Sequence, residues 1–172
     1  MPKNAIPPLR IAGCVSDSIV DGPGMRYVVF VQGCPHHCPG CHNPQTHDFA
    51  GGYIADPDQI VQQVEADPLM SGVTFSGGEP FCQPEALASL GERIRALGKN
   101  IVIYSGYVFE QLLQMGEQNP SILRLLRLAD LLVDGPYIEA QRDLTLQYRG
   151  SRNQRLVRVP EALAAAGLDE PK

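Results

Sequence analysis

Three cysteines, Cys34, Cys38 and Cys41, occupy a segment rich in glycine and proline, and they are the residues most suited to chemistry. Spacings of four and three positions in such a loop let three thiolates turn toward one metal centre, because neither a helix nor a strand restrains them. Three protein ligands leave one coordination position of that centre open. A structural zinc site is the alternative; it normally has four protein ligands, and one of four histidines could complete it: His36, His37, His42 or His47.

The other two cysteines, Cys14 and Cys82, lie outside this spacing, and we interpret them as small buried hydrophobic residues. An odd number of cysteines, with three crowded together, is poorly explained by disulfide pairing. Cys14 ends a small-residue stretch like a bacterial lipoprotein cleavage box. Residues 1–10, however, contain three prolines and no apolar run of the roughly 7–15 residues that an export signal needs. The sequence favours a reducing, cytoplasmic location.

Four apolar runs have the composition of β-strands: Tyr27–Val31, Gly72–Phe75, Ile101–Tyr104 and Leu131–Val133. Each run is followed by residues suited to a binding site. In chain order, these are Gly33 with the cysteines, Ser76 with Gly77, then Ser105, and finally Asp134. Because the carboxyl ends of parallel strands share one edge of a sheet, we expect these residues to meet at one rim.

Helical segments separate these strands. A helix is predicted to begin at Asp56, which can cap it, with Pro57 at the first helical position. A second is predicted up to Gly98, and two more over 108–115 and 121–129. This alternation predicts an α/β fold with a parallel sheet. A complete eight-stranded β/α barrel typically needs about 250 residues, so we expect an incomplete parallel β/α barrel, as a single domain over 1–172 with its core at about 15–157.

Charge and hydropathy exclude two classes of partner. Lys and Arg total 14 against 19 Asp and Glu, and the net charge is -5. Because the basic residues form no block, we expect no nucleic-acid partner and no anionic membrane surface. The densest apolar run, Tyr27–Val31, is far shorter than the ~20 residues of a membrane span.

The cysteine spacing, together with Ser76-Gly77-Gly78-Glu79-Pro80, resembles the radical S-adenosylmethionine enzymes. The resemblance implies that Cys34, Cys38 and Cys41 hold three irons of a 4Fe-4S cluster, while the methionine moiety of S-adenosyl-L-methionine chelates the fourth. Gly77, Gly78 and Glu79 would bind the amino group of that moiety, since glycines allow close approach and a carboxylate accepts from an ammonium. Bulk at Gly78 is accordingly expected to exclude the cofactor and spare the cluster.

Further segments are similar to the glycyl-radical-enzyme activases and, among them, to the anaerobic ribonucleoside-triphosphate reductase activating proteins. These segments are Asp21–Arg26, Phe30–Cys34, Cys41–Pro44, Leu132–Gly135 and Tyr148–Gln154. The resemblance implies reductive cleavage of S-adenosyl-L-methionine and transfer of a hydrogen atom from a glycine of the large reductase subunit. It also implies a reduced flavodoxin-type electron donor.

Several positions refine the expected cofactor site. Gly40 stands where many radical enzymes have an aromatic residue, so backbone contact with the adenine is expected there, and His42 would replace an aromatic residue after the third cysteine. Ser105 and Asp134 are further predicted cofactor contacts, whereas Pro136 stands where close relatives tend to have lysine. His36 and His37 are expected near the cluster mouth. Three arginines form either a solvated face or a partner contact: Arg149, Arg152 and Arg155.

An incomplete barrel has an open side, and a reactive radical must be shielded from water. We therefore expect a macromolecular substrate that covers this side. Three alternatives stay open: activation of another glycyl radical enzyme, a small-molecule radical reaction, and a noncatalytic zinc-binding interaction module.

Overall fold

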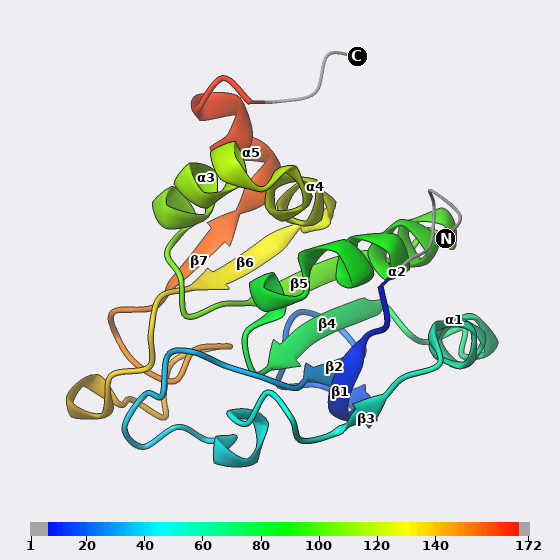
Figure 1. Ribbon diagram of the computed structural model, residues 1–172, viewed down its shortest axis with the longest axis horizontal. Helices are drawn as coiled ribbons and strands as arrows, with labels where there is room; N and C mark the ends of the chain where they lie inside the picture. Colours follow the sequence, from blue (N-terminus) through cyan, green and yellow to red (C-terminus); the bar gives the residue numbers. More distant parts are fainter. Residues whose placement is uncertain (1–6, 169–172) are drawn as a thin grey trace.

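A seven-stranded sheet runs through the protein in a computed structural model that describes residues 7–168 (Figure 1). Its strands are β1 (Arg10–Ser18), β2 (Arg26–Val31), β3 (Tyr53–Ile54), β4 (Gly72–Gly77), β5 (Asn100–Tyr104), β6 (Leu131–Asp134) and β7 (Arg155–Arg158). Their order is β3-β1-β2-β4-β5-β6-β7. The four predicted strands, β2, β4, β5 and β6, are parallel neighbours, so the α/β prediction with a parallel sheet is confirmed.

The sheet also has antiparallel edges that were not predicted from the sequence. β1 pairs antiparallel with both β2 and β3, and β7 pairs antiparallel with β6. The sheet is therefore mixed, and it is open at β3 and β7.

Five α-helices lie to one side of this sheet, whereas the cysteine loop and the segment after β6 lie on the other side (Figure 1). They are α1 (Pro57–Ala66), α2 (Pro84–Ala96), α3 (Phe109–Gln118), α4 (Pro120–Leu128) and α5 (Val159–Ala165). The Asp56 carboxylate accepts the N–H of Asp58 at the start of α1, as predicted for a capping residue. Three short 3-10 helices lie in the loops: η1 (Pro44–Thr46), η2 (Pro80–Cys82) and η3 (Glu139–Gln141).

The hydrophobic core lies between the helices and the sheet and extends beyond the predicted limits of 15–157. Leu9 and Ile11 are buried at one end of the chain, and Val159 and Leu163 at the other. The edge strands and α5 therefore contribute to the packed core. Among residues 7–168, no helix has both the length and the apolar character to cross a bilayer.

Arg26, at the end of the activase-like segment, is fully buried and structural. Its guanidinium donates to Thr74 Oγ1 at 3.1 Å and to the Val73 carbonyl at 2.7 Å. It also bonds the side chain of Asn100. Burial lowers the pKa of Arg26 to about 10. The side chain thus ties β2 to the amino ends of β4 and β5, at the end of the sheet opposite the cysteine loop.

Candidate functional site

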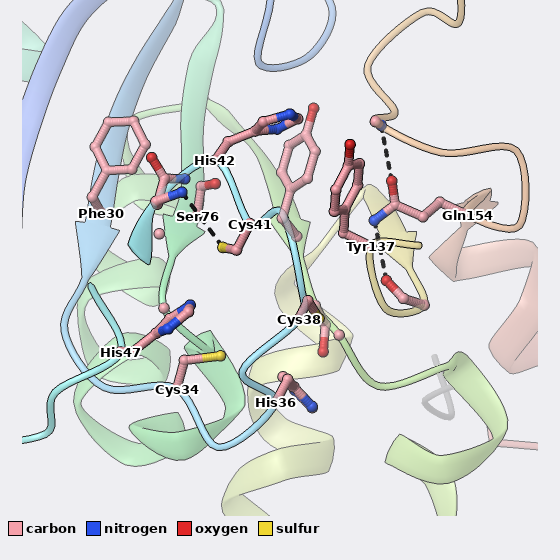
Figure 2. Close-up of a pocket in the computed structure, with 18 of the residues that line it drawn as sticks. Phe30, Cys34, His36, Cys38, Cys41, His42, His47, Ser76, Tyr137 and Gln154 are labelled. Atoms are coloured by element: carbon pink, nitrogen blue, oxygen red, sulfur yellow. Dashed lines mark hydrogen bonds between the residues drawn. The ribbon is translucent and has the colours of Figure 1, made fainter. Parts of the chain in front are cut away.

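The three motif cysteines line one cavity of about 370 Å³ at the carboxyl ends of the parallel strands (Figure 2). Ser76, Gly77 and Gly78 from the end of β4 line the same cavity, as do Ser105 and Gly106 after β5 and Gly135 after β6. The predicted meeting of strand ends at one rim is therefore observed.

Backbone hydrogen bonds hold the cysteine loop against the segment that contains η1. The N–H of Gly33 donates to Thr46 O at 2.7 Å, and that of Cys34 donates to His47 O at 3.2 Å. Within the loop, Cys41 N donates to Cys38 O at 3.1 Å. The start of the cysteine motif is thus anchored to the η1 segment, and its end closes in a turn of its own.

The donor set of the cavity fits an iron–sulfur cluster. All three thiols are free; Cys34 is buried and the other two are partly exposed. Burial raises the pKa of the Cys34 thiol. Within residues 7–168, no three His, Cys, Asp or Glu side chains converge as the ligands of a single metal ion would. A four-iron cluster takes each thiolate on a different iron, so its ligands are spread around a cavity, as these are.

Gly77 and Gly78 bring the end of β4 against the start of the cysteine loop. A Cβ at Gly77, where φ is +91°, would lie 2.8 Å from the Cα of Phe30. A Cβ at Gly78 would lie 2.3 Å from the carbonyl oxygen of Gly33. The clash falls on the residue directly before Cys34, so bulk at Gly78 is expected to disturb the cysteine loop as well as the cofactor site; whether the cluster survives it stays a prediction.

Glu79 lies beside the cavity but does not line it, because its carboxylate is completely buried. Oε1 lies 2.7 Å from Nε2 of His36 and accepts from Ser105 Oγ at 2.9 Å and Gly106 N at 2.8 Å. Oε2 accepts from Phe81 N at 2.9 Å. The protein's own groups thus occupy both oxygens, and a direct bond from Glu79 to the cofactor stays a prediction.

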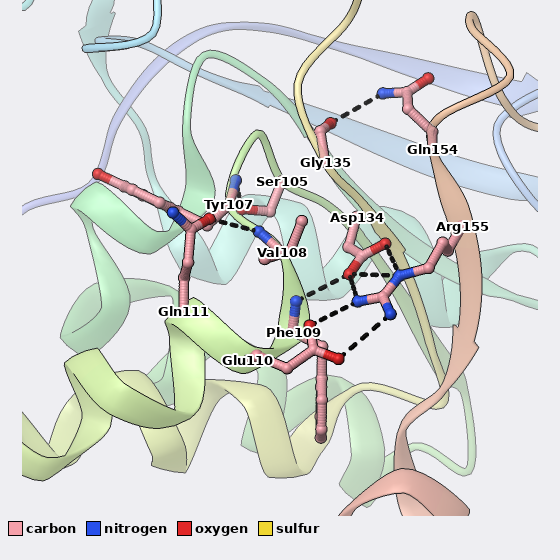
Figure 3. Close-up of polar contacts among 10 residues, drawn as sticks. All are labelled: Ser105, Tyr107, Val108, Phe109, Glu110, Gln111, Asp134, Gly135, Gln154 and Arg155. Atoms are coloured by element: carbon pink, nitrogen blue, oxygen red, sulfur yellow. Dashed lines mark hydrogen bonds and ion pairs between the residues drawn. The ribbon is translucent and has the colours of Figure 1, made fainter.

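Asp134 also directs its carboxylate away from the cavity (Figure 3). It accepts from Phe109 N at 2.8 Å, at the start of α3, and from Arg155 Nε at 3.0 Å. Arg155 also donates from Nη2 to Glu110 Oε2 at 2.7 Å, and this hydrogen bond lowers the pKa of the Glu110 carboxyl. Asp134 and Arg155 therefore join β6, β7 and α3, and the residue that faces the cavity is Gly135.

His42 lines the cavity, whereas Gly40 does not. The His42 ring packs against Tyr137 with centroids 4.8 Å apart, so the two rings form an aromatic wall. Gly40, where φ is +76°, lies against the carboxylate of Glu139, and a Cβ there would overlap it. At Pro136, the carbonyl accepts from Asn153 Nδ2 at 2.7 Å.

Gln154 and Tyr137 are cavity residues that were not singled out individually from the sequence. Oε1 of Gln154 accepts from Gly150 N at 2.9 Å, and its Nε2 donates to Gly135 O at 3.1 Å (Figures 2 and 3). The Arg-Gly-Ser-Arg-Asn-Gln segment is thereby fastened to the end of β6. The only sequence signal for Gln154 was its place in that motif.

The remaining candidates have mixed outcomes. His36 lines the cavity, but His37 does not. Neither Cys14 nor Cys82 lines the cavity. Cys14 is half-buried and packs against the core, in partial agreement with its interpretation as a small buried hydrophobic residue, whereas for Cys82, which is exposed, that interpretation is wrong.

Comparisons with known proteins agree with this site. Residues 20–157 match the family described as a 4Fe-4S single cluster domain. The anaerobic ribonucleoside-triphosphate reductase-activating protein of Escherichia coli K12 is 35% identical over 144 residues, which cover 79% of this chain and 90% of the relative. The protein of the same name from Enterobacteria phage T4 is 32% identical over 153 residues, covering 86% and 90%.

Among solved structures, QueE from Escherichia coli overlaps 58% of this chain and 53% of its own, with a TM-score of 0.48 and 16% identity. The identities to the curated relatives extend over most of both chains. This chain belongs to the family of anaerobic ribonucleoside-triphosphate reductase-activating proteins.

Proposed function

We propose that this protein is a radical S-adenosylmethionine activase that generates a glycyl radical on the large subunit of an anaerobic ribonucleoside-triphosphate reductase. The observation that carries the proposal is the single cavity lined by three free motif cysteines and by Ser76, Gly77 and Gly78. Family membership supports the choice of partner. A reduced flavodoxin-type donor, a cytoplasmic location and a sheet curved as an incomplete barrel belong to the same proposal.

Cys34, Cys38 and Cys41 would hold a 4Fe-4S cluster with one iron open to S-adenosyl-L-methionine. When bound, this pair would supply one-electron reductive cleavage of the sulfonium, the chemistry that abstraction of a hydrogen atom from the substrate glycine requires. Gly77 and Gly78 would give the methionine moiety close access to backbone groups. His42 and Tyr137, packed on each other, would offer the adenine an aromatic face.

The surface beside the cavity supports a macromolecular substrate. A neighbouring groove of about 450 Å³ shares four lining residues with the cavity: Asp21, His42, Tyr104 and Gly150. Its rim carries Ile19, Val20 and Leu144, which are 73%, 70% and 82% exposed. Exposed apolar side chains gathered beside a site favour contact with another protein. We propose that the glycine-bearing segment of the reductase enters along this groove.

Anaerobic purification followed by iron and sulfide analysis tests the proposal. We expect about four irons and four sulfides per chain, and slow cleavage of S-adenosyl-L-methionine by the reduced protein alone, because no target is present. Adding the large reductase subunit should couple cleavage to formation of a radical on that subunit. A colourless zinc protein without labile sulfide would contradict the proposal and support the interaction module.

A further inference from the structure

His47 is a cavity residue considered from the sequence only as a possible zinc ligand. It directly follows η1, and its ring lines the cavity with the three motif cysteines (Figure 2). Its carbonyl accepts from Cys34 N at 3.2 Å, and the preceding carbonyl, of Thr46, accepts from Gly33 N at 2.7 Å. Two backbone hydrogen bonds therefore fix His47 beside the first cysteine of the motif.

One ring nitrogen of His47 is buried without a hydrogen-bond partner among the described residues. Nε2 is buried and makes no hydrogen bond with any residue in the range 7–168. Burial of a polar nitrogen is unfavourable unless it finds a partner, and most such atoms in folded proteins are hydrogen-bonded. The ring also packs edge-on against His37, with centroids 5.1 Å apart and planes at 84°, which restricts its rotation. Because His47 lines the cavity, a group bound there is the partner that we consider for this nitrogen.

The other cavity histidines are already engaged. Nε2 of His36 is 2.7 Å from Glu79, and the ring of His42 packs on Tyr137. Among the three, His47 alone presents a buried nitrogen without a partner. The sulfurs of an iron–sulfur cluster accept hydrogen bonds, and these bonds help to set its reduction potential.

We infer that the Nε2–H of His47 donates a hydrogen bond to a sulfur of the cluster and raises its reduction potential. The bond stabilises the added electron, because a donor proton facing sulfur interacts more favourably with the more negative, reduced cluster. His47 is then a positioning residue that tunes the cluster and is not one of its ligands. This inference rests on the proposed function, since it requires a cluster in the cavity.

The test is a potentiometric titration of the reconstituted protein, monitored by electron paramagnetic resonance in the absence of S-adenosyl-L-methionine. His47→Phe keeps a ring but removes the donor, so its midpoint potential should be lower than that of the unaltered protein. His47→Gln restores an N–H and should recover part of the shift. Tyr53→Phe is the control, because Tyr53 is exposed on β3 and does not line the cavity, and its potential should be unchanged.

Iron and sulfide contents distinguish tuning from ligation. We expect them to be unchanged in both His47 variants. An unchanged potential in His47→Phe would overturn the inference. Loss of the cluster from a folded His47→Phe protein, as expected for the cysteine variants, would also overturn it by making His47 a ligand.

A measurement on the unaltered sequence avoids any effect of a substitution on folding. In the reduced protein labelled with ¹⁵N-histidine, pulsed electron paramagnetic resonance should detect a weak histidine nitrogen coupling and a nearby proton that exchanges in D₂O. Absence of both signals from a loaded cluster contradicts the inference. Failure of the proposed function would differ: either the unaltered protein would contain no iron and sulfide, or its loaded cluster would show both signals and yet form no radical on the reductase.

Discussion

Nε2 of His36 lies 2.7 Å from Oε1 of Glu79, and this contact joins the cysteine loop to the Gly-Gly-Glu-Pro segment. The His36 ring sits against Gly106, where a Cβ would come within 2.4 Å of it, and packs edge-on against Tyr107 at 4.5 Å. Glu79 therefore holds the cysteine loop in place through His36, whatever contact it also makes with the cofactor.

His36→Phe should loosen this loop, because the variant keeps a ring but leaves the buried carboxylate with one partner fewer. We expect the free energy of unfolding of the cluster-free protein to fall by about 1–3 kcal/mol, measured by urea denaturation. The loaded variant should also lose iron to a chelator faster. Tyr53→Phe serves as the control, because Tyr53 is exposed on β3 and lies outside the loop.

The double variant His36→Phe/Glu79→Gln measures how strongly the two residues are coupled. Because both substitutions remove the same contact, their combined cost should be less than the sum of the single costs. Strictly additive costs would show that the contact contributes nothing to the stability of the loop.

Replacing any of Cys34, Cys38 or Cys41 with Ala should abolish the visible absorption of the reconstituted protein and cofactor cleavage, because each thiolate is needed for one iron. Cys14→Ala and Cys82→Ala should retain both properties, since neither residue lines the cavity. Absorption spectra and iron analysis provide the measurement. Cluster loss confined to the Cys82 variant would refute the ligand assignment.

Gly78→Ala should impair both the cluster and the cofactor site, because its Cβ would lie 2.3 Å from the Gly33 carbonyl oxygen. We expect lower iron content after reconstitution, together with weaker binding of S-adenosyl-L-methionine by titration. Gly13→Ala is the matched control, since a Cβ there has no atom within 4 Å. Full iron content in Gly78→Ala would contradict the prediction, because it would show that the cysteine loop can shift without losing the cluster.

Cys82 should be alkylated slowly in the cluster-free protein even though the residue is exposed. Partial burial of the thiol and the nearby Glu79 and Cys34 raise its pKa to about 12. The unfolded chain loses the thiol proton at a pKa of about 8.5, whereas the folded protein still holds it. The free energy of unfolding is therefore highest below that pH and falls as the pH rises toward the pKa of the folded protein. Site-resolved mass spectrometry should show an iodoacetamide rate that still increases above pH 9; a plateau near pH 9 would contradict the raised pKa.

The parallel centre of the fold could be predicted because apolar runs such as Tyr27–Val31 end sharply at glycine or polar residues. The antiparallel edges could not. All four residues of β7 retain solvent exposure, and arginine stands at both of its ends, so it shows no buried strand pattern. The pairing of β7 with β6 depends on contacts distant in sequence, among them the bond from Arg155 to Asp134.

The cysteines and glycines of the site were also predictable, because their chemistry depends on type and spacing. The orientation of the acidic residues was not. Glu79 turns to His36, 43 positions away, and Asp134 turns to Arg155, 21 positions away. Such partners become visible only when the strand ends are assembled into one rim.

The most direct test of the account is the electron paramagnetic resonance spectrum of the large reductase subunit after incubation with the reduced, loaded protein and S-adenosyl-L-methionine. We expect a doublet from a glycyl radical, split by the one hydrogen left on the α-carbon, and Cys41→Ala should give no signal. The splitting should collapse when the reductase contains α-deuterated glycine. Cleavage of the cofactor by a competent cluster without any radical on the reductase would contradict the proposed activity.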